Sequence, residues 1–204
     1  MIYYRHLFHS EEKLSANEGI LYSELIYRSL LTDEFMFNGK FSPELAKGYL
    51  QHIEDKSQIP YIDMCPFNVS RLADRLEMSR PAINRNKEKL IKKRLLIPRS
   101  LSKGDYFILC PSKMLDGGYI NLPTETGLSG RQLVFYGCLL DRGQYHVHTV
   151  DTWAKRLGEI YGLNEENVFS LIRILKKAGY VERLPNGKLN VVTKQKEESP
   201  DSSQ

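Results

Sequence analysis

The chain has 204 residues, of which 41% are hydrophobic and 26% charged, and its formal net charge is +4. This length suits one domain or two small ones, and the apolar content is sufficient for folded cores. Because no window approaches eighteen consecutive apolar residues and the N-terminus does not read as a signal peptide, we expect a cytoplasmic protein without a membrane span.

The cysteines and the charges narrow the class further. Cys65, Cys110 and Cys138 are odd in number and widely spaced, which favours reduced, packing thiols. Residues 67–103 contain eleven Lys or Arg and three Asp or Glu, a local charge of +8 that leaves −4 for the rest of the chain. A basic island of this kind is typical of proteins that bind a polyanion.

The first expected helix begins within LSANEGILYSELI (14–26), and the same pattern returns as LSGRQLVFYGCLL (128–140). Each copy starts with a capping box, Ser15 with Glu18 and Ser129 with Gln132. Between this helix and the next, the first copy carries an insertion over about 33–66. Within it we predict a hairpin around Asn38-Gly39, a helix over 42–55 and a short strand over 61–64.

The second and third helices also recur. VSRLADRL (69–76) matches VDTWAKRL (150–157), with Ser70 expected as the N-cap of the first of these. The end of the third helix, IKKRLLIPR (91–99), matches LKKAGYVER (175–183). The second copy then has about three extra residues between its second and third helices.

Each copy ends in a predicted β-hairpin, over 95–110 and 180–192, and residues 145–148 are a further candidate strand. The expected domains are therefore 1–110 with its insertion and 128–192. A Gly- and Pro-rich connection covers 111–127, and 193–204 is expected to be a disordered tail.

Three helices, a short strand and a terminal hairpin resemble a winged helix-turn-helix, and two in one chain resemble the tandem winged-helix proteins of bacteria. These include transcription regulators and the replication initiators of plasmids and phages. The resemblance implies a mainly α fold with small β wings (α+β), two winged helix-turn-helix domains in tandem, and DNA binding. The first copy departs from the pattern at Lys87, where an apolar residue is usual, and at Arg94, where glycine is usual.

The third helix of the first copy is expected to begin near Ser79, with Pro81 in its first turn, and to place Ile83 and Leu90 inward. A recognition helix contacts bases with the residues near its N-terminus. The residues expected to read bases are Ser79, Arg80, Asn84, Arg85 and Glu88. The residues expected to contact phosphates are Arg71, Lys87, Lys89, Lys92, Lys93 and Lys103. A lysine-rich helix that is simply a solvated face is the alternative.

The corresponding helix of the second copy starts with Glu165 and Glu166, which suit the helix dipole but repel phosphates. This domain is expected to serve dimerisation or partner binding, or to read DNA more weakly through Arg173, Lys176 and Lys177. The sequence contains none of the phosphate-loop, GxSxG or HExxH motifs, so we expect no enzyme and no cofactor. His146 and His148 have the spacing of some metal sites, but no third ligand is evident, and no metal is expected.

The sequence therefore predicts a sequence-specific protein that binds double-stranded DNA and acts as a transcription regulator. A replication initiator of a mobile element is the first alternative, and a scaffold that binds protein partners is the second. Since two-fold half-sites are common for this fold, a homodimer is a further expectation that the sequence leaves open.

Overall fold

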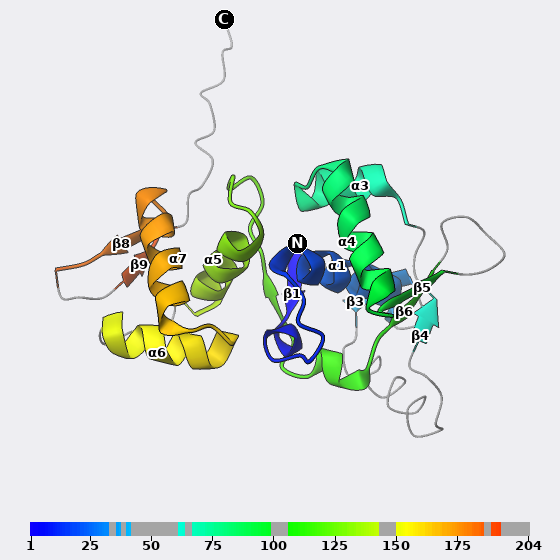
Figure 1. Ribbon diagram of the computed structural model, residues 1–204, viewed down its shortest axis with the longest axis horizontal. Helices are drawn as coiled ribbons and strands as arrows, with labels where there is room; N and C mark the ends of the chain where they lie inside the picture. The colour runs from blue at the N-terminus through cyan, green and yellow to red at the C-terminus, as the bar shows by residue number, and fades with distance from the viewer. Residues whose placement is uncertain are drawn as a thin grey trace, which may run out of the picture. The chain divides into compact units, whose positions relative to one another are not determined.

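The computed structural model (Figure 1) describes residues 1–32, 36–37, 40–41, 61–63, 67–98, 106–142, 150–185 and 189–192. The chain divides into two compact units, Met1–Gly137 and Cys138–Gln204, called the first and the second unit below. Each unit combines helices with small antiparallel sheets, as the predicted α+β class requires.

The first unit holds most of the secondary structure. Its elements are β1 (Ile2–Tyr4), the 3-10 helix η1 (Arg5–Phe8), α1 (Ala16–Thr32), β2 (Met36–Phe37), β3 (Lys40–Phe41), β4 (Tyr61–Asp63), α3 (Val69–Leu76), α4 (Arg80–Lys92), β5 (Leu96–Pro98), β6 (Tyr106–Leu109), the 3-10 helix η2 (Ser112–Leu115), β7 (Tyr119–Asn121) and the beginning of α5 (Gly130–Arg142). The second unit contains the end of α5, α6 (Val150–Tyr161), α7 (Glu165–Lys177), β8 (Val181–Arg183) and β9 (Leu189–Val191).

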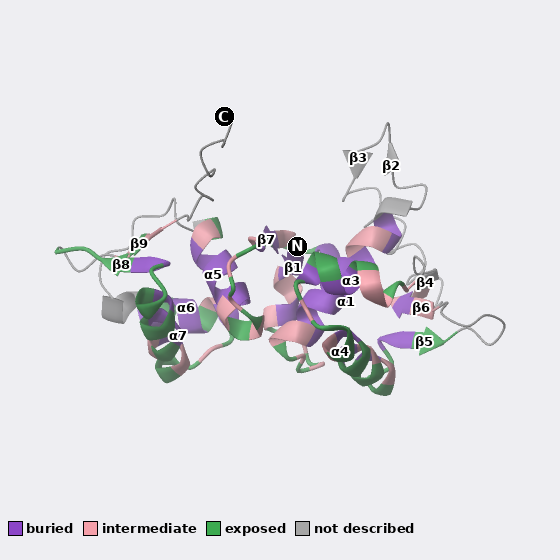
Figure 2. Ribbon diagram, turned by 90° about the horizontal axis from the view of Figure 1, so that it is seen from above, coloured by how far each residue is buried: buried purple, intermediate pink, exposed green. Residues whose placement is uncertain are grey.

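Helix α1 is the central element of the first unit. Its predicted capping box is confirmed, because the Ser15 N–H donates to Glu18 Oε2 over 3.1 Å and the Glu18 N–H donates to Ser15 Oγ over 3.4 Å. The helix packs against β1 and α4, and Figure 2 shows it buried along most of its length. Its fully buried apolar residues are Ile20, Leu21, Tyr22, Leu25, Ile26 and Leu30.

The predicted hairpins are confirmed where the structure describes them. Strand β2 pairs with β3, β5 with β6, and β8 with β9, all antiparallel. The predicted strand over 61–64 is β4, which pairs with the other edge of β6 and gives a sheet of order β4-β6-β5. The β5–β6 hairpin of the first unit is therefore joined through β6 to β4, the strand that comes before α3.

Residues 111–127, which the sequence predicts as a connection, contain η2 and β7. Strand β7 pairs with β1, with Tyr3 opposite Ile120. Helix α5 packs closely on this strand, because a Cβ built on Gly137 would lie 2.6 Å from Leu122 Cδ2 and 3.2 Å from the Asn121 carbonyl oxygen. These contacts explain why the first unit extends to Gly137 rather than to residue 110.

From the end of its first helix onward, the helix-turn-helix of the first unit recurs in the second at a separation of 85 residues. Helices α4 and α7 are both 13 residues long, and a left-handed residue follows each, Arg94 with φ 57° and Gly179 with φ 75°. The backbone hydrogen bonds also repeat: the N–H of Leu95 donates to the carbonyl of Leu90, and that of Tyr180 to Leu175, each over 2.9 Å. The internal repeat is thus a property of the backbone as well as of the sequence.

Two details of the sequence alignment are wrong. The alignment of 91–99 with 175–183 is off by one residue. It superposes the lysine pairs 92–93 and 176–177, which lie 84 residues apart, whereas the buried positions next to the turn lie 85 residues apart. The extra residues of the second copy do not lengthen the connection either. They extend α6 to Tyr161, and residues 77–79 and 162–164 are turns of equal length. One additional helical turn keeps the same face of α6 inward.

Several predictions lie outside the described residues. These are the helix over 42–55, the strand over 145–148 with its two histidines, the tip of the hairpin over 95–110 with Lys103, and the tail over 193–204. Among the described residues, no helix has the length and apolar character needed to cross a membrane.

Candidate nucleic-acid interface

The helix-turn-helix of the first unit is formed by α3, a three-residue turn and α4. Helix α3 is capped by Asn68, whose side chain accepts the Arg71 N–H over 3.0 Å, so the expectation that Ser70 is the N-cap is wrong. Asn68 has the extended backbone that an N-cap requires, and its side-chain oxygen satisfies a donor of the first turn.

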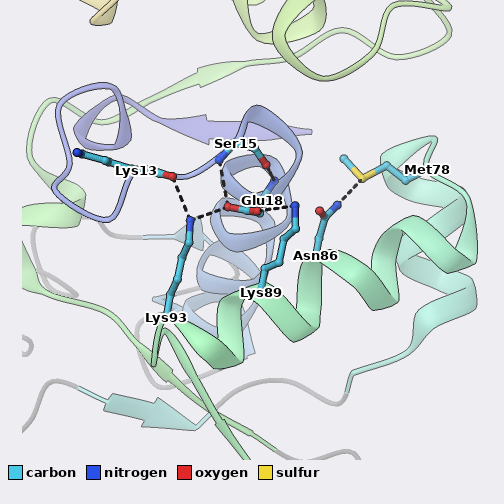
Figure 3. Close-up of polar contacts among 7 residues, drawn as sticks. All are labelled: Lys13, Ser15, Glu18, Met78, Asn86, Lys89 and Lys93. Atoms are coloured by element: carbon cyan, nitrogen blue, oxygen red, sulfur yellow. Dashed lines mark hydrogen bonds and ion pairs between the residues drawn. The ribbon is translucent and has the colours of Figure 1, made fainter.

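The start of α4 is confirmed at the predicted place. The Ala82 N–H donates to Ser79 Oγ over 3.3 Å, and Pro81 lies in the first turn, where its missing N–H costs nothing. Ile83 and Leu90 are fully buried, as expected. Asn86 is buried with them, and its Nδ2 lies 4.0 Å from Met78 Sδ in the turn (Figure 3). The corresponding residue of α7 is the buried Leu171.

The five residues predicted to read bases are all exposed on or beside α4. Figure 2 shows α4 with an exposed face turned away from the buried α1. Arg85 and Glu88 lie on the side opposite the buried residues, as the 3.6-residue period requires, and Asn84 lies on its flank. The complete exposed set is Ser79, Arg80, Asn84, Arg85 and Glu88.

The residues predicted to contact phosphates fall into different environments. Arg71 and Lys92 are exposed. The Lys87 side chain is only 19% exposed, and its ammonium lies 5.4 Å from the centroid of the Phe67 ring and 4.0 Å from Glu88 Oε1. This cation–π contact explains how a lysine is accommodated where an apolar residue is usual, because the aliphatic stem packs while the charge meets the ring.

Lys89 and Lys93 face α1 and converge on Glu18 (Figure 3). Lys89 Nζ lies 3.1 Å from Glu18 Oε1, and Lys93 Nζ lies 2.8 Å from Glu18 Oε2. Lys93 also donates to the carbonyl oxygen of Lys13 over 3.0 Å. Since the Glu18 side chain is only 4% exposed, the capping carboxylate of α1 is held in a largely buried site between the two helices.

The surroundings of Glu18 favour its ionised form. Burial alone raises the pKa of its carboxyl group. The hydrogen bonds from Lys93 and the Ser15 N–H, together with Lys89, outweigh burial and lower the pKa from 4.5 to about 2.

Because the folded pKa of Glu18 is depressed, its ionised carboxylate contributes stability above the unfolded pKa of 4.5, and this contribution is lost as the pH falls toward 2. We expect Glu18→Gln to lower the free energy of unfolding by about 1–3 kcal/mol at pH 7. The difference between the two proteins should shrink between pH 5 and pH 2. Urea titrations across this range measure it, and a difference that stays constant with pH would contradict the assignment.

Helix α7 presents a different surface. Glu165 and Glu166 are exposed in its first turn, after the N-cap Asn164. Arg173, Lys176 and Lys177, the residues expected to make secondary contacts, are also exposed. Ile174, which occupies the place of Lys89, is 38% exposed. The charge pattern of α4 is therefore not repeated on α7, although the backbone is.

Two further observations concern metal binding and similarity to known proteins. Within the described part of the chain, no group of three or more His, Cys, Asp or Glu residues could hold a metal ion. Comparison of the chain with models of protein families, with curated proteins and with solved structures gives no match.

Sequence reasoning missed the role of Glu18 beyond the capping box, and with it the pairing of Lys89 and Lys93. A signal was present in the repeat. Position 18 is Gln132 in the second copy, and the residues 85 positions after the two lysines are Ile174 and Ala178. The carboxylate and both of its partners are thus absent together, which is the pattern that a shared contact produces.

Proposed function

We propose that the protein binds double-stranded DNA in a sequence-specific manner, through the helix-turn-helix of its first unit, and acts as a transcription regulator. In this proposal each unit is a winged helix-turn-helix domain, with β5–β6 and β8–β9 as the wings. The observation that carries the proposal is the exposed face of α4, where Arg80, Asn84 and Arg85 lie on the helix that follows the turn.

The chemistry of this face suits base edges in the major groove. Arginine makes bidentate hydrogen bonds with guanine, asparagine with adenine, and glutamate accepts from cytosine. Helix α4 is the second helix of the motif, which in helix-turn-helix proteins enters the major groove. Arg71 on α3 and Lys92 on α4 are exposed, and we propose them as phosphate contacts.

The second unit is proposed to serve dimerisation or partner binding, with weaker DNA contact as the alternative. The support is that Glu165 and Glu166 are exposed in the first turn of α7. This turn corresponds to the N-terminal turn of α4, which is proposed to contact bases. Carboxylates at this position favour the helix dipole but repel the phosphate backbone.

The proposal is tested by titrating the protein with a 20-base-pair duplex at several salt concentrations. If Arg71, Lys87 and Lys92 each contact one phosphate, the logarithm of the association constant should fall with the logarithm of salt concentration with a slope of about −2.7. Absence of binding to any duplex at low salt would reject the proposal and favour a scaffold that binds proteins.

Selection of bound duplexes from a random pool then tests sequence specificity. A common motif is expected among the recovered sequences, and an unenriched pool would leave only non-specific binding. Footprinting in the native genome distinguishes the two biological roles, because a regulator occupies promoters whereas a replication initiator occupies repeated sites at an origin.

A further inference from the structure

Two buried carboxylates of α1 contact side chains of the helix-turn-helix. Glu18 is 3% exposed and Glu24 is 0% exposed. A buried carboxylate is strongly unfavourable unless cations and hydrogen bonds surround it. The cations that surround these two come largely from α3 and α4, the helices proposed to bind DNA.

Glu18 contacts α4 with both of its oxygens. Oε1 meets Lys89 and Oε2 meets Lys93, one helical turn further along (Figure 3). Because the two lysines are four residues apart, they lie on one face of α4 and approach the carboxylate from the same side. These contacts tie the C-terminal end of α4 to the first turn of α1.

Glu24 contacts α3. Its Oε1 accepts a hydrogen bond from Arg75 Nε and another, of 3.1 Å, from Arg28 Nε on its own helix. Among the described residues, Glu24 Oε2 has no hydrogen-bond partner. Within the described residues, the hydrogen bonds to this carboxylate come from Arg28 on α1 and Arg75 on α3.

The second copy shows that this arrangement is not required by the fold. The positions of Glu18 and Glu24 are Gln132 and Cys138. When the helices are aligned through the shared turn, 85 residues apart, the residue that corresponds to Arg75 is Ile160, in place of the Arg156 that the sequence match of 69–76 with 150–157 pairs with it. With Ile174 and Ala178 in place of the two lysines, every charged member that links α1 to the motif is replaced by a neutral residue. The charged contacts therefore occur in the copy with the basic helix-turn-helix and are absent from these positions of the second copy, although both copies share the backbone.

We propose that Glu18 and Glu24 are positioning residues for DNA binding. Glu18 holds α4 against α1 and engages Lys89 and Lys93 in place of phosphate, and Glu24 ties α3 to α1 through Arg75. This inference rests on the proposed function. Under this proposal the ammonium groups of Lys89 and Lys93 serve Glu18, although their side chains are 55% and 32% exposed. Arg71, Lys87 and Lys92 then form the proposed phosphate set among the described residues.

The paired variants Lys92→Gln and Lys93→Gln test which lysine meets phosphate, because they remove the same charge from neighbouring positions. In salt titrations with a random-sequence 20-base-pair duplex, Lys92→Gln should make the slope shallower by about 0.9, the value for one lost contact. Lys93→Gln should leave the wild-type slope unchanged. An equal loss of slope in both variants would overturn the inference.

The variant Glu18→Gln tests positioning, since an amide oxygen can still accept the Ser15 N–H and complete the capping box. Its matched control is Glu11→Gln, which removes the same charge from an exposed turn residue before α1. With duplexes obtained by selection, Glu18→Gln should reduce the ratio of specific to random-duplex affinity at least threefold. The control should leave this ratio unchanged.

The outcomes separate the two levels of the proposal. Circular dichroism and thermal unfolding establish that each variant is folded at the assay temperature. If folded Glu18→Gln retained the specificity ratio of Glu11→Gln, the positioning role would be rejected while DNA binding stood. If the wild-type protein bound no duplex, the proposed function itself would fail.

Discussion

Replacing Gly158 by alanine should destabilise the second unit by about 2 kcal/mol or more, because a new methyl group would collide with backbone. A Cβ built at this buried position of α6 lies 2.4 Å from the Leu163 carbonyl oxygen, within the turn that leads to α7. The same turn is closed by the Leu163 N–H, which donates to the Gly158 carbonyl over 2.9 Å. Relief of the collision must therefore move the turn, and with it the N-cap of α7.

Amide hydrogen exchange of α6 and α7 measures this loss, with the amides of α3 and α4 as an internal reference for the first unit. The control is Ala73→Gly, at the corresponding position of α3, where the Met78 N–H makes the same bond to the Ala73 carbonyl. This change should cost only about 1 kcal/mol through helix propensity. Wild-type exchange rates in Gly158→Ala would show that the turn adapts without cost.

Replacing Arg85 by alanine should weaken binding to the selected duplex by about 1–3 kcal/mol and relax the preference at one base pair, if its guanidinium reads guanine. Arg85 is exposed on α4 opposite the buried Ile83 and Leu90, so folding stability should change by no more than about 0.5 kcal/mol. Arg80→Ala should behave in the same way at a different base pair. Competition between the selected duplex and its single-base variants measures both effects.

Arg156→Ala is the matched control, because Arg156 is an exposed arginine of α6 outside the proposed interface. It removes the same charge and should leave the base preference intact. Equal effects of Arg85→Ala and Arg156→Ala would show that α4 contributes only general electrostatic attraction. A change of specificity confined to the α4 variants would support direct base reading.

Local signals were sufficient to place most helix starts and hairpins. Ser15 with Glu18, and Ser79 with Pro81, satisfy or remove backbone donors within three residues of themselves, so their effect is visible in a short stretch of sequence. The hairpins followed from turn residues flanked by strand-forming runs. Asn68 shows the limit of such reasoning, since Asn68 and Ser70 are both residue types that favour N-caps and the backbone selected Asn68.

Contacts between distant segments were not predictable in this way. The link from Arg75 to Glu24 spans 51 residues, and that from Lys93 to Glu18 spans 75. Nothing in the sequence near α4 therefore indicates that Lys89 and Lys93 pair with Glu18. The pairing of β7 with β1 was not predictable either, because the two strands lie more than 100 residues apart in the sequence.

The sequence by itself determined the repeated order of helices and hairpins, the start of α4 and the residues on its exposed face, because these depend on local backbone chemistry and helical period. Tertiary structure alone decided which cations of that helix pair with a carboxylate of α1. It did so because a buried carboxylate needs positive partners, and packing α4 on α1 brought Lys89 and Lys93 to Glu18.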